Sequence, residues 1–167
     1  MNELNRKTVT EFKQAEKQSI IVVLDNIRSM HNVGSVFRSA DAFLIKAVFL
    51  CGYTPQPPHR DIHKTALGAT ETVDWIYFPS TVEAVQSLNS EGYEVYAVEQ
   101  AEGSTQLNKL NWTRQTPLAV VFGNEVEGVS TDVLPLTKGC IEIPQFGMKH
   151  SLNVSVAAGI VLWELVR

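Results

Sequence analysis

The chain has 167 residues, of which 44% are hydrophobic and 19% charged, and its formal net charge is -4. This size and composition predict one compact soluble domain and argue against a second. The acidic balance disfavours a protein that coats nucleic acid non-specifically, while a local basic patch remains compatible with RNA binding. No apolar run reaches the roughly 18 residues of a membrane span, and the first residues lack a signal-peptide core, so we expect a cytoplasmic protein.

The chain divides into a polar N-terminal segment, residues 1–18, which we expect to be a surface helix or an arm, and a single domain over residues 19–167. In the domain, apolar runs rich in β-branched residues predict strands, most of them covered on both faces. These runs span residues 20–24, 47–51, 72–78, 95–98, 118–122 and 140–143.

Helical patterns lie between these runs. Apolar residues at helical spacing predict a helix over residues 33–44, with Asn32 as a possible N-cap. A capping box from Ser80 to Glu83 starts another helix, which Gly92 ends. The final helix, from residue 154, has almost no polar face and must therefore be covered nearly all round. The proline-rich stretch 53–64 predicts a long exposed loop.

Alternation of strands and helices predicts an α/β fold, a mostly parallel sheet flanked by helices. Ligands bind such sheets at the carboxyl ends of the strands. Polar or glycine-containing segments follow the predicted strands there, and we expect function among them: Asp25-Asn26, Gly52-Tyr53, Glu99-Gln100, Gly123-Asn124-Glu125 and Pro144-Gln145.

Arg38 lies off the apolar stripe of the predicted helix 33–44. It could simply pair with Asp41 on a solvated helix face. Alternatively, its guanidinium group could grip a phosphate together with Arg28 and Arg60, since guanidinium binds phosphate in bidentate fashion.

The segment Gly123-Asn124-Glu125-Val-Glu-Gly128 directly follows a buried strand. It could be an ordinary turn, or a loop whose glycines let a ligand approach the backbone while Asn124 and Glu125 supply polar groups. It is neither the dinucleotide fingerprint nor a phosphate-binding P-loop, because the glycine and lysine spacings of both are missing.

Ser151 and Asn153 open the last helix, where either could be an N-cap. A serine hydrolase is disfavoured because the sequence lacks a G-x-S-x-G elbow. His59 and His63 have metal-like spacing, but prolines precede them and no third ligand stands out, so we expect no metal. The two cysteines lie in strand-like segments and are interpreted as buried thiols.

Taken together, these segments resemble the SpoU/TrmH branch of the SPOUT RNA methyltransferases. The matching motifs are Asn32-x-Gly34-x-x-x-Arg38, Gly123-Asn-Glu125-x-Glu-Gly128, and Ile143-Pro144 followed by Ser151-Leu-Asn153-Val-Ser-Val-Ala, within residues 19–166. The resemblance implies an S-adenosylmethionine-dependent enzyme that methylates a ribose 2′-hydroxyl in tRNA or rRNA. It also implies a deep C-terminal trefoil knot that forms the cofactor site, and a homodimer.

The resemblance assigns roles residue by residue. Catalytic positions are Arg38, Glu125, Ser151 and Asn153. Cofactor positions are Val98, Glu99, Gly123, Asn124, Gly128, Ile143, Gln145, Ser151 and Leu152, although the family often has Met where this chain has Gln145. The expected RNA surface comprises Arg28, His31, Asn32, Arg38, Arg60, Lys64 and Lys149, with Arg6, Lys7, Lys13 and Lys17 as auxiliaries.

The role of Arg38 stays open at this point. Guanidinium is a poor base, because its pKa lies above about 12, and it is better suited to anchoring a phosphate or stabilising an oxyanion. The alternative to an enzyme is a catalytically silent RNA-binding or assembly factor on the same fold. The presence of Arg38, Glu125, Ser151 and Asn153 favours the enzyme.

Overall fold

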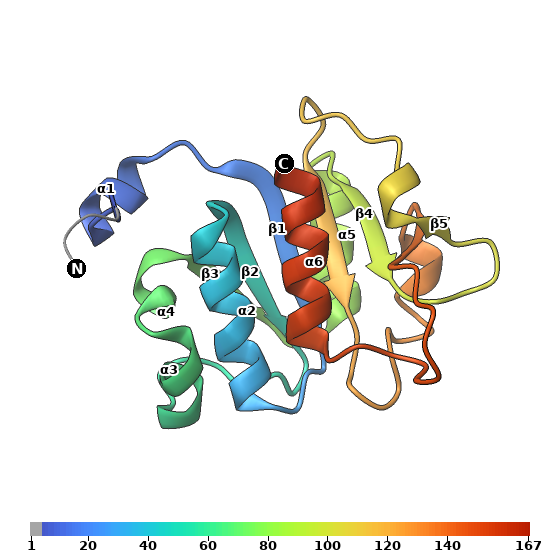
Figure 1. Ribbon diagram of the computed structural model, residues 1–167, viewed down its shortest axis with the longest axis horizontal. Helices are drawn as coiled ribbons and strands as arrows, with labels where there is room; N and C mark the ends of the chain where they lie inside the picture. Colours follow the sequence, from blue (N-terminus) through green and yellow to red (C-terminus); the bar gives the residue numbers. More distant parts are fainter. Residues whose placement is uncertain (1–4) are drawn as a thin grey trace.

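Residues 5–167 are described by a computed structural model in which seven parallel strands form a single sheet (Figure 1). The strand order is β3-β2-β1-β6-β4-β7-β5. The predicted parallel α/β architecture is therefore confirmed. The strands are β1 (Gln18–Asp25), β2 (Ile45–Cys51), β3 (Asp74–Phe78), β4 (Glu94–Val98), β5 (Thr105–Gln106), β6 (Leu118–Phe122) and β7 (Gly139–Glu142).

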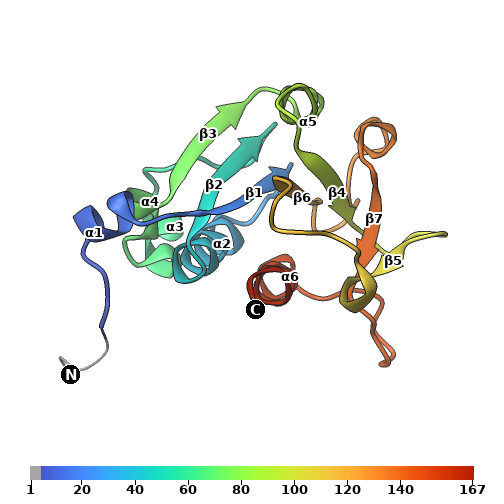
Figure 2. The same cartoon turned by 90° about the horizontal axis from the view of Figure 1, so that it is seen from above.

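Helices cover both faces of the sheet, with α2 and α6 on one face and α5 on the other (Figure 2). Alternation along β1 divides its side chains between two cores. Ile20, Val22 and Leu24 pack toward α2 and α6, whereas Ile21 and Val23 pack toward α5. All five are almost wholly buried, which explains why the strand is a continuous apolar run without a polar face.

The helices are α1 (Val9–Gln14), α2 (Met30–Ala42), α3 (Arg60–Ala66), α4 (Ala69–Thr72), α5 (Thr81–Ser90) and α6 (Val154–Val166). Two short 3-10 helices, η1 (Leu107–Lys109) and η2 (Leu134–Leu136), complete the described part of the chain. The predicted start of α5 is confirmed, since Ser80 Oγ accepts the Glu83 N–H at 3.2 Å. Gly92 follows this helix with a φ of 85°, a conformation that glycine adopts without strain.

The predicted N-cap of α2 was wrong. Ser29 caps the helix by accepting the Asn32 N–H at 3.2 Å, so the helix begins three residues earlier than expected. Asn32 therefore lies within the first turn. Its side chain is free to contact residues outside the helix instead of capping it.

The predicted exposed loop 53–64 was also only partly right. Thr54 is buried, and its Oγ1 accepts the Ile27 N–H at 3.0 Å. The end of the stretch is helical, because α3 begins at Arg60 with His59 as its N-cap. The imidazole Nδ1 of His59 accepts the Asp61 N–H at 3.1 Å, which gives this histidine a structural role.

Within the expected N-terminal segment, residues Val9–Gln14 form α1 and residues 1–4 lie outside the described chain. Phe12 anchors α1 in the core with only 3% of its surface exposed. No helix in residues 5–167 is long and apolar enough to cross a membrane. The deep trefoil knot, in which the C-terminal segment would pass through a loop, stays a prediction.

Candidate functional site

Two adjoining hollows lie at the carboxyl ends of β4, β6 and β7, where the loop before α6 crosses them. Their volumes are about 120 and about 330 Å³. They share Val98 and Glu99 from the end of β4, and Ser151, Leu152 and Ala157 from the last segment of the chain. The position agrees with the general location of ligand sites in parallel α/β sheets.

Every residue that the resemblance assigns to the cofactor lines at least one of these hollows. The smaller hollow contains Ile143 and Gln145, the larger contains Gly123, Asn124 and Gly128, and the remaining four belong to both: Val98, Glu99, Ser151 and Leu152. The walls combine aliphatic side chains with a carboxylate, amides and a hydroxyl. Such a mixture suits a ligand that has a flat ring and several polar groups.

Asn124 holds the loop after β6 in shape. Its side chain is 6% exposed, and its Oδ1 accepts the N–H groups of Val126 and Glu127 at 2.9 and 3.0 Å. Its Nδ2 donates to the Asn26 carbonyl at 2.8 Å and to the Tyr53 hydroxyl at 2.9 Å. Asn124 is thus first a structural residue of this loop, whose hydrogen bonds tie β6 to the ends of β1 and β2.

The glycines of this loop allow two close approaches. A Cβ on Gly123 would lie 2.1 Å from backbone atoms of Gly128 and Val129, so the loop could not close with a larger residue. Gly128 has a φ of 73°, and a Cβ there would lie 2.7 Å from Glu99 Oε2. Glu99 uses that oxygen to accept the Val129 N–H at 2.9 Å, which fixes its carboxylate against the loop.

Glu125 ties the same loop to the start of α2. Its carboxylate accepts the N–H groups of Arg28 and Ser29 at 3.0 and 3.1 Å, and Asn32 Nδ2 at 3.2 Å. Partial burial alone would raise the pKa of Glu125, but the hydrogen bonds from these groups outweigh it and hold the pKa below its usual value. Glu125 is therefore an anion at neutral pH.

Asn153 completes this polar cluster from the start of α6. Its Oδ1 caps the helix by accepting the Ser155 N–H at 2.9 Å, while its Nδ2 donates to Asn32 Oδ1 at 3.1 Å. Glu125, Asn32 and Asn153 consequently form one chain of hydrogen bonds. Glu125 and Asn153 both line the larger hollow. Ser151 lines it too, and its side chain is exposed.

Arg38 does not join this cluster within one chain. It lies six residues after Asn32 on α2, which places it about 9 Å further along the helix axis and about 120° around it. It is exposed and lines a different hollow, beside α1 and α4. The possible pair with Asp41 is not formed among residues 5–167; Asp41 instead accepts a hydrogen bond from Thr72 Oγ1.

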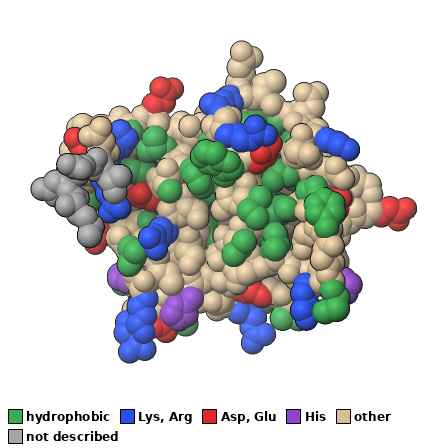
Figure 3. Space-filling model, in the orientation of Figure 1, with side chains coloured by type: hydrophobic (Ala, Val, Ile, Leu, Met, Phe, Trp, Pro, Cys, Tyr) green, Lys and Arg blue, Asp and Glu red, His purple; other side chains and the backbone are tan. Residues whose placement is uncertain are grey.

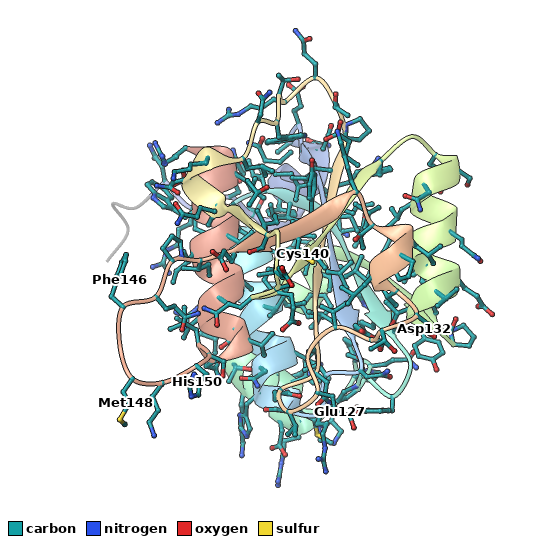
Figure 4. All side chains as sticks on the ribbon, turned by 90° about the vertical axis from the view of Figure 1, so that its right-hand side faces the viewer. Glu127, Asp132, Cys140, Phe146, Met148 and His150 are labelled. Carbon is teal, nitrogen blue, oxygen red and sulfur yellow. The ribbon has the colours of Figure 1, made fainter. Side chains whose placement is uncertain are left out.

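The other expected RNA-binding residues surround the site without meeting at one point. Arg28 and His31 are exposed at the start of α2, and Lys149 is exposed in the loop before α6. Arg60 and Lys64 lie on α3, where each has a nitrogen 3.4 Å from Asp61 Oδ1. Figure 4 shows Phe146 and Met148 projecting outward from the loop that contains Lys149, and their side chains are 97% and 81% exposed.

Sequence reasoning identifies Asp25 only as the end of a strand and misses its structural role beside the site. Its carboxylate is fully buried at the end of β1 and accepts Thr81 Oγ1 at 2.6 Å, the Ser130 N–H at 2.7 Å and Ser130 Oγ at 3.1 Å. It thereby fixes the far end of the loop that lines the larger hollow. A carboxylate directly after a wholly apolar strand was the available signal.

Two cysteine thiols lie near carboxylates of the site, Cys51 near Asp25 and Cys140 near Glu99. Burial, opposed by a hydrogen bond from Thr81 and helped by the Asp25 charge, raises the pKa of the Cys51 thiol to about 12. Cys51 and Cys140 are both free thiols. No group of three His, Cys, Asp or Glu side chains within residues 5–167 is arranged to hold a metal ion.

The fold and the site define a parallel α/β protein that binds a small ligand at the carboxyl edge of its sheet. A model of the SpoU rRNA methylase family matches residues 19–163, and the chain belongs to this family. The resemblance noted from the motifs is therefore confirmed.

Named relatives and solved structures agree with this assignment. A tRNA (guanosine(18)-2′-O)-methyltransferase of Thermus thermophilus is 33% identical over 99% of this chain and 83% of its own length. A 23S rRNA (guanosine-2′-O-)-methyltransferase RlmB of Vibrio parahaemolyticus is 31% identical over 99% of this chain and 66% of its own. The AdoMet-bound rRNA methyltransferase from Sinorhizobium meliloti superimposes with a TM-score of 0.83 at 25% identity, covering 92% of this chain and 58% of that one.

Proposed function

We propose that this protein is an S-adenosylmethionine-dependent RNA methyltransferase that modifies a ribose 2′-hydroxyl in tRNA or rRNA. The observation that carries the proposal is the chain of hydrogen bonds from Glu125 through Asn32 to Asn153, beside hollows lined by all nine expected cofactor residues. The names of the relatives from Thermus and Vibrio support the same reaction, and the AdoMet-bound neighbour supports the cofactor.

The residues present fit this cofactor. The aliphatic side chains of Val98, Ile143 and Leu152 would hold the adenine ring, and the Glu99 carboxylate offers an acceptor for hydroxyl groups. When bound, S-adenosylmethionine supplies a methyl group on a positively charged sulfur that an oxygen nucleophile can attack. Gln145, which stands where the family often has Met, would place an amide in the smaller hollow.

The polar cluster would act mainly by positioning. Glu125 uses both carboxylate oxygens to hold the turn before α2, so its charge fixes Asn32 in place. Asn153, held by its hydrogen bond to Asn32, lines the larger hollow, where a ribose hydroxyl could be oriented. Holding reactants in such a fixed geometry can contribute a large part of an enzymatic rate.

We further propose that the protein is a homodimer. One face of α6 exposes an apolar stripe of Val156, Ile160 and Trp163, which are 51%, 40% and 57% exposed. Figure 3 shows hydrophobic side chains gathered over α6, with Lys and Arg side chains toward α1 and α2. A second copy placed on this stripe would complete the cover that an all-apolar helix needs.

In the proposed dimer, Arg38 would act on the site of the second subunit. Its α2 neighbour Ser39 lies beside Gly159 of α6, so Arg38 flanks the apolar stripe. Because Arg38 and Asn32 leave α2 in different directions, a catalytic role for Arg38 would be exerted toward the cofactor hollow of the second subunit. There the protonated guanidinium would anchor a phosphate or stabilise developing charge on the 2′-oxygen.

Methyl transfer from labelled S-adenosylmethionine to total tRNA and total rRNA tests the enzymatic proposal. We expect transfer by the wild-type protein and a loss of roughly 100-fold or more in Arg38→Ala, with cofactor binding measured by calorimetry unchanged. Lys109→Ala, which removes an exposed cation that lines neither cofactor hollow, is the matched control. Absence of transfer to both RNAs while the cofactor binds would leave the silent RNA-binding factor as the better proposal.

Sedimentation velocity tests the dimer. Trp163→Glu places a charge in the stripe and should convert dimers to monomers. Ile76→Glu, at an equally exposed apolar position on β3, should leave the mass unchanged. A wild-type monomer at micromolar concentration would contradict the proposal.

A further inference from the structure

Tyr53 is an exposed aromatic residue at the carboxyl edge of the sheet, and none of the proposed catalytic steps uses it. It lies in the turn after β2 and is 58% exposed. Its hydroxyl accepts a hydrogen bond at 2.9 Å from Nδ2 of Asn124, a buried residue that lines the larger hollow. A surface tyrosine commonly buries its ring and leaves its hydroxyl in water. Here the hydroxyl is bonded inward, so the exposed surface belongs mainly to the ring.

The turn that contains Tyr53 is fixed at several points. Gly52 has a φ of 65°, and a Cβ there would lie 1.8 Å from Asn26 Oδ1, so the turn closes tightly on the end of β1. The same Asn26 oxygen accepts the Tyr53 N–H at 3.1 Å, and the Gly52 carbonyl accepts the Tyr77 hydroxyl at 2.9 Å. A ring held at its backbone and at its hydroxyl loses little further freedom when a ligand stacks on it.

A cation of the expected RNA surface lies beside this turn. The Ile27 N–H donates to Thr54 Oγ1 at 3.0 Å, which brings the next residue, Arg28, close to the turn. Arg28 is exposed, and its N–H donates to Glu125 Oε2 at 3.0 Å. Glu125 lines the larger hollow. Hydrogen bonds therefore connect the exposed ring, the exposed cation and the proposed reaction site.

An exposed ring beside a cation matches the chemistry of an unpaired nucleotide. The cation attracts the phosphate, and the aromatic face stacks on the base, whichever base it is, because every base has a flat π-face. The expected RNA surface consists of Arg, Lys, His and Asn side chains, which suit mainly phosphates and sugars. Tyr53 is not among them, and it would contact a different part of the polymer.

We propose that Tyr53 is a nucleobase-binding residue, on which an unpaired base at or next to the methylated nucleotide stacks. The inference rests on the proposed function for the identity of the polymer. A base inside a duplex must first leave its stack, which costs free energy, whereas a base in a loop is already available. Tyr53 would therefore favour single-stranded segments of the RNA as substrates.

Fluorescence anisotropy with two labelled oligomers tests the proposal. One is a single-stranded oligoadenylate, and the other is an abasic ribose-phosphate oligomer of the same length. Tyr53→Leu removes the ring and should weaken oligoadenylate binding about fivefold or more, the lower end of the effect of one stacked base. Tyr53→Phe keeps the ring, so its affinity should stay within about twofold of wild type. Neither variant should bind the abasic oligomer differently, because that oligomer offers phosphates and no base.

The pair of variants separates stacking from a structural role. If Tyr53 acted only through its hydrogen bond to Asn124, Tyr53→Phe would lose as much affinity as Tyr53→Leu, since both lack the hydroxyl. Ile76→Ala is the control for lost apolar surface. It shortens a 50% exposed side chain on the neighbouring strand β3 and should leave both affinities unchanged.

The proposal is wrong if Tyr53→Leu binds oligoadenylate as wild type does, or if it loses affinity for both oligomers equally. It is also wrong if wild-type protein does not prefer oligoadenylate to the abasic oligomer. Methyl transfer judges the enzymatic proposal separately. Base-dependent binding without methyl transfer would keep the nucleobase site and remove the enzyme, whereas methyl transfer by a protein whose affinity ignores the base would do the reverse.

Discussion

Asn153 Nδ2 donates to Asn32 Oδ1 at 3.1 Å, joining two side chains that are 121 residues apart in the chain. The other end of the Asn153 amide caps α6, and the other end of the Asn32 amide donates to Glu125. Each amide therefore uses its oxygen and its nitrogen for different elements. The three motifs are held in one arrangement by three polar side chains in series, Glu125, Asn32 and Asn153.

Asn153→Asp separates the two roles of this side chain, which caps α6 and donates a hydrogen bond to Asn32. Aspartate keeps the oxygen that caps α6 and is as good an N-cap as asparagine, but it cannot donate to Asn32. We expect the free energy of unfolding in urea to stay within about 0.5 kcal/mol of wild type, while methyl transfer falls about five- to tenfold. Asn153→Ala should also lose about 1 kcal/mol of stability, and equal stability losses in the two variants would contradict the assigned cap.

Glu125→Gln tests the charge of the cluster through its pH dependence. Because hydrogen bonds hold the folded-state pKa of Glu125 below its unfolded value, the carboxylate stabilises the fold above about pH 4.3, and this contribution is lost as pH falls through the lower folded pKa. The melting temperature of wild type should therefore exceed that of the variant at neutral pH, and the two curves should converge in acid, once the pH falls below the lowered folded-state pKa of Glu125.

The control for Glu125→Gln is Glu127→Gln. It removes a charge from the same exposed loop without removing the hydrogen bonds from Arg28, Ser29 and Asn32. If the melting temperature of Glu125→Gln lies as far below that of wild type in acid as at neutral pH, the charge of Glu125 is not the cause of the difference.

Asp25→Asn should weaken cofactor binding without weakening RNA binding. The amide cannot accept hydrogen bonds at both of its ends, so a buried donor of Ser130 or Thr81 loses its partner, at a cost of about 1–3 kcal/mol. Calorimetry with S-adenosylmethionine and anisotropy with RNA separate the two affinities. Glu102→Gln, which changes an exposed carboxylate that lines neither cofactor hollow, is the control, and a parallel loss of both affinities would indicate general unfolding instead of loop positioning.

Gly34→Ala should destabilise the packing of α2 against α3. An added Cβ would lie 2.1 Å from Thr65 Oγ1 and 2.2 Å from the Ile62 carbonyl oxygen, so one helix must shift. We expect the free energy of unfolding to fall by about 1–3 kcal/mol, measured by urea denaturation. Gly147→Ala has no atom within 4 Å of its added Cβ and should be neutral. A neutral Gly34→Ala would mean that the two helices are not in close contact.

The sequence predicted the main strands well because each is apolar on both faces and bounded by polar residues. It could not predict their order, since β6 lies between β1 and β4 although it follows both in the chain. The strand β5 was missed because two residues carry no periodicity. The cap of α2 was misplaced because Ser29 and Asn32 are equally good candidates locally, and only the distant Glu125 and Asn153 distinguish them.

The individual cofactor residues were predicted from the resemblance to the family. The general rule for parallel sheets predicted the same part of the molecule, because the carboxyl ends of all the strands lie at one edge of the sheet. Arg38 shows what such reasoning lacks. Its motif places it six residues after Asn32, yet helical rotation directs Asn32 to Glu125 and Asn153 and directs Arg38 to a hollow beside α1 and α4.

The position of β6 between β1 and β4 also bears on how the domain folds. Ile20 of β1 pairs with Leu118 of β6, so the centre of the sheet closes only when almost 100 residues of intervening chain have been brought together. The site uses residues from both sides of that closure and exists only in the complete sheet. A cofactor that binds there binds the folded state alone, and by mass action its cellular concentration contributes to how long each molecule survives unfolding and proteolysis.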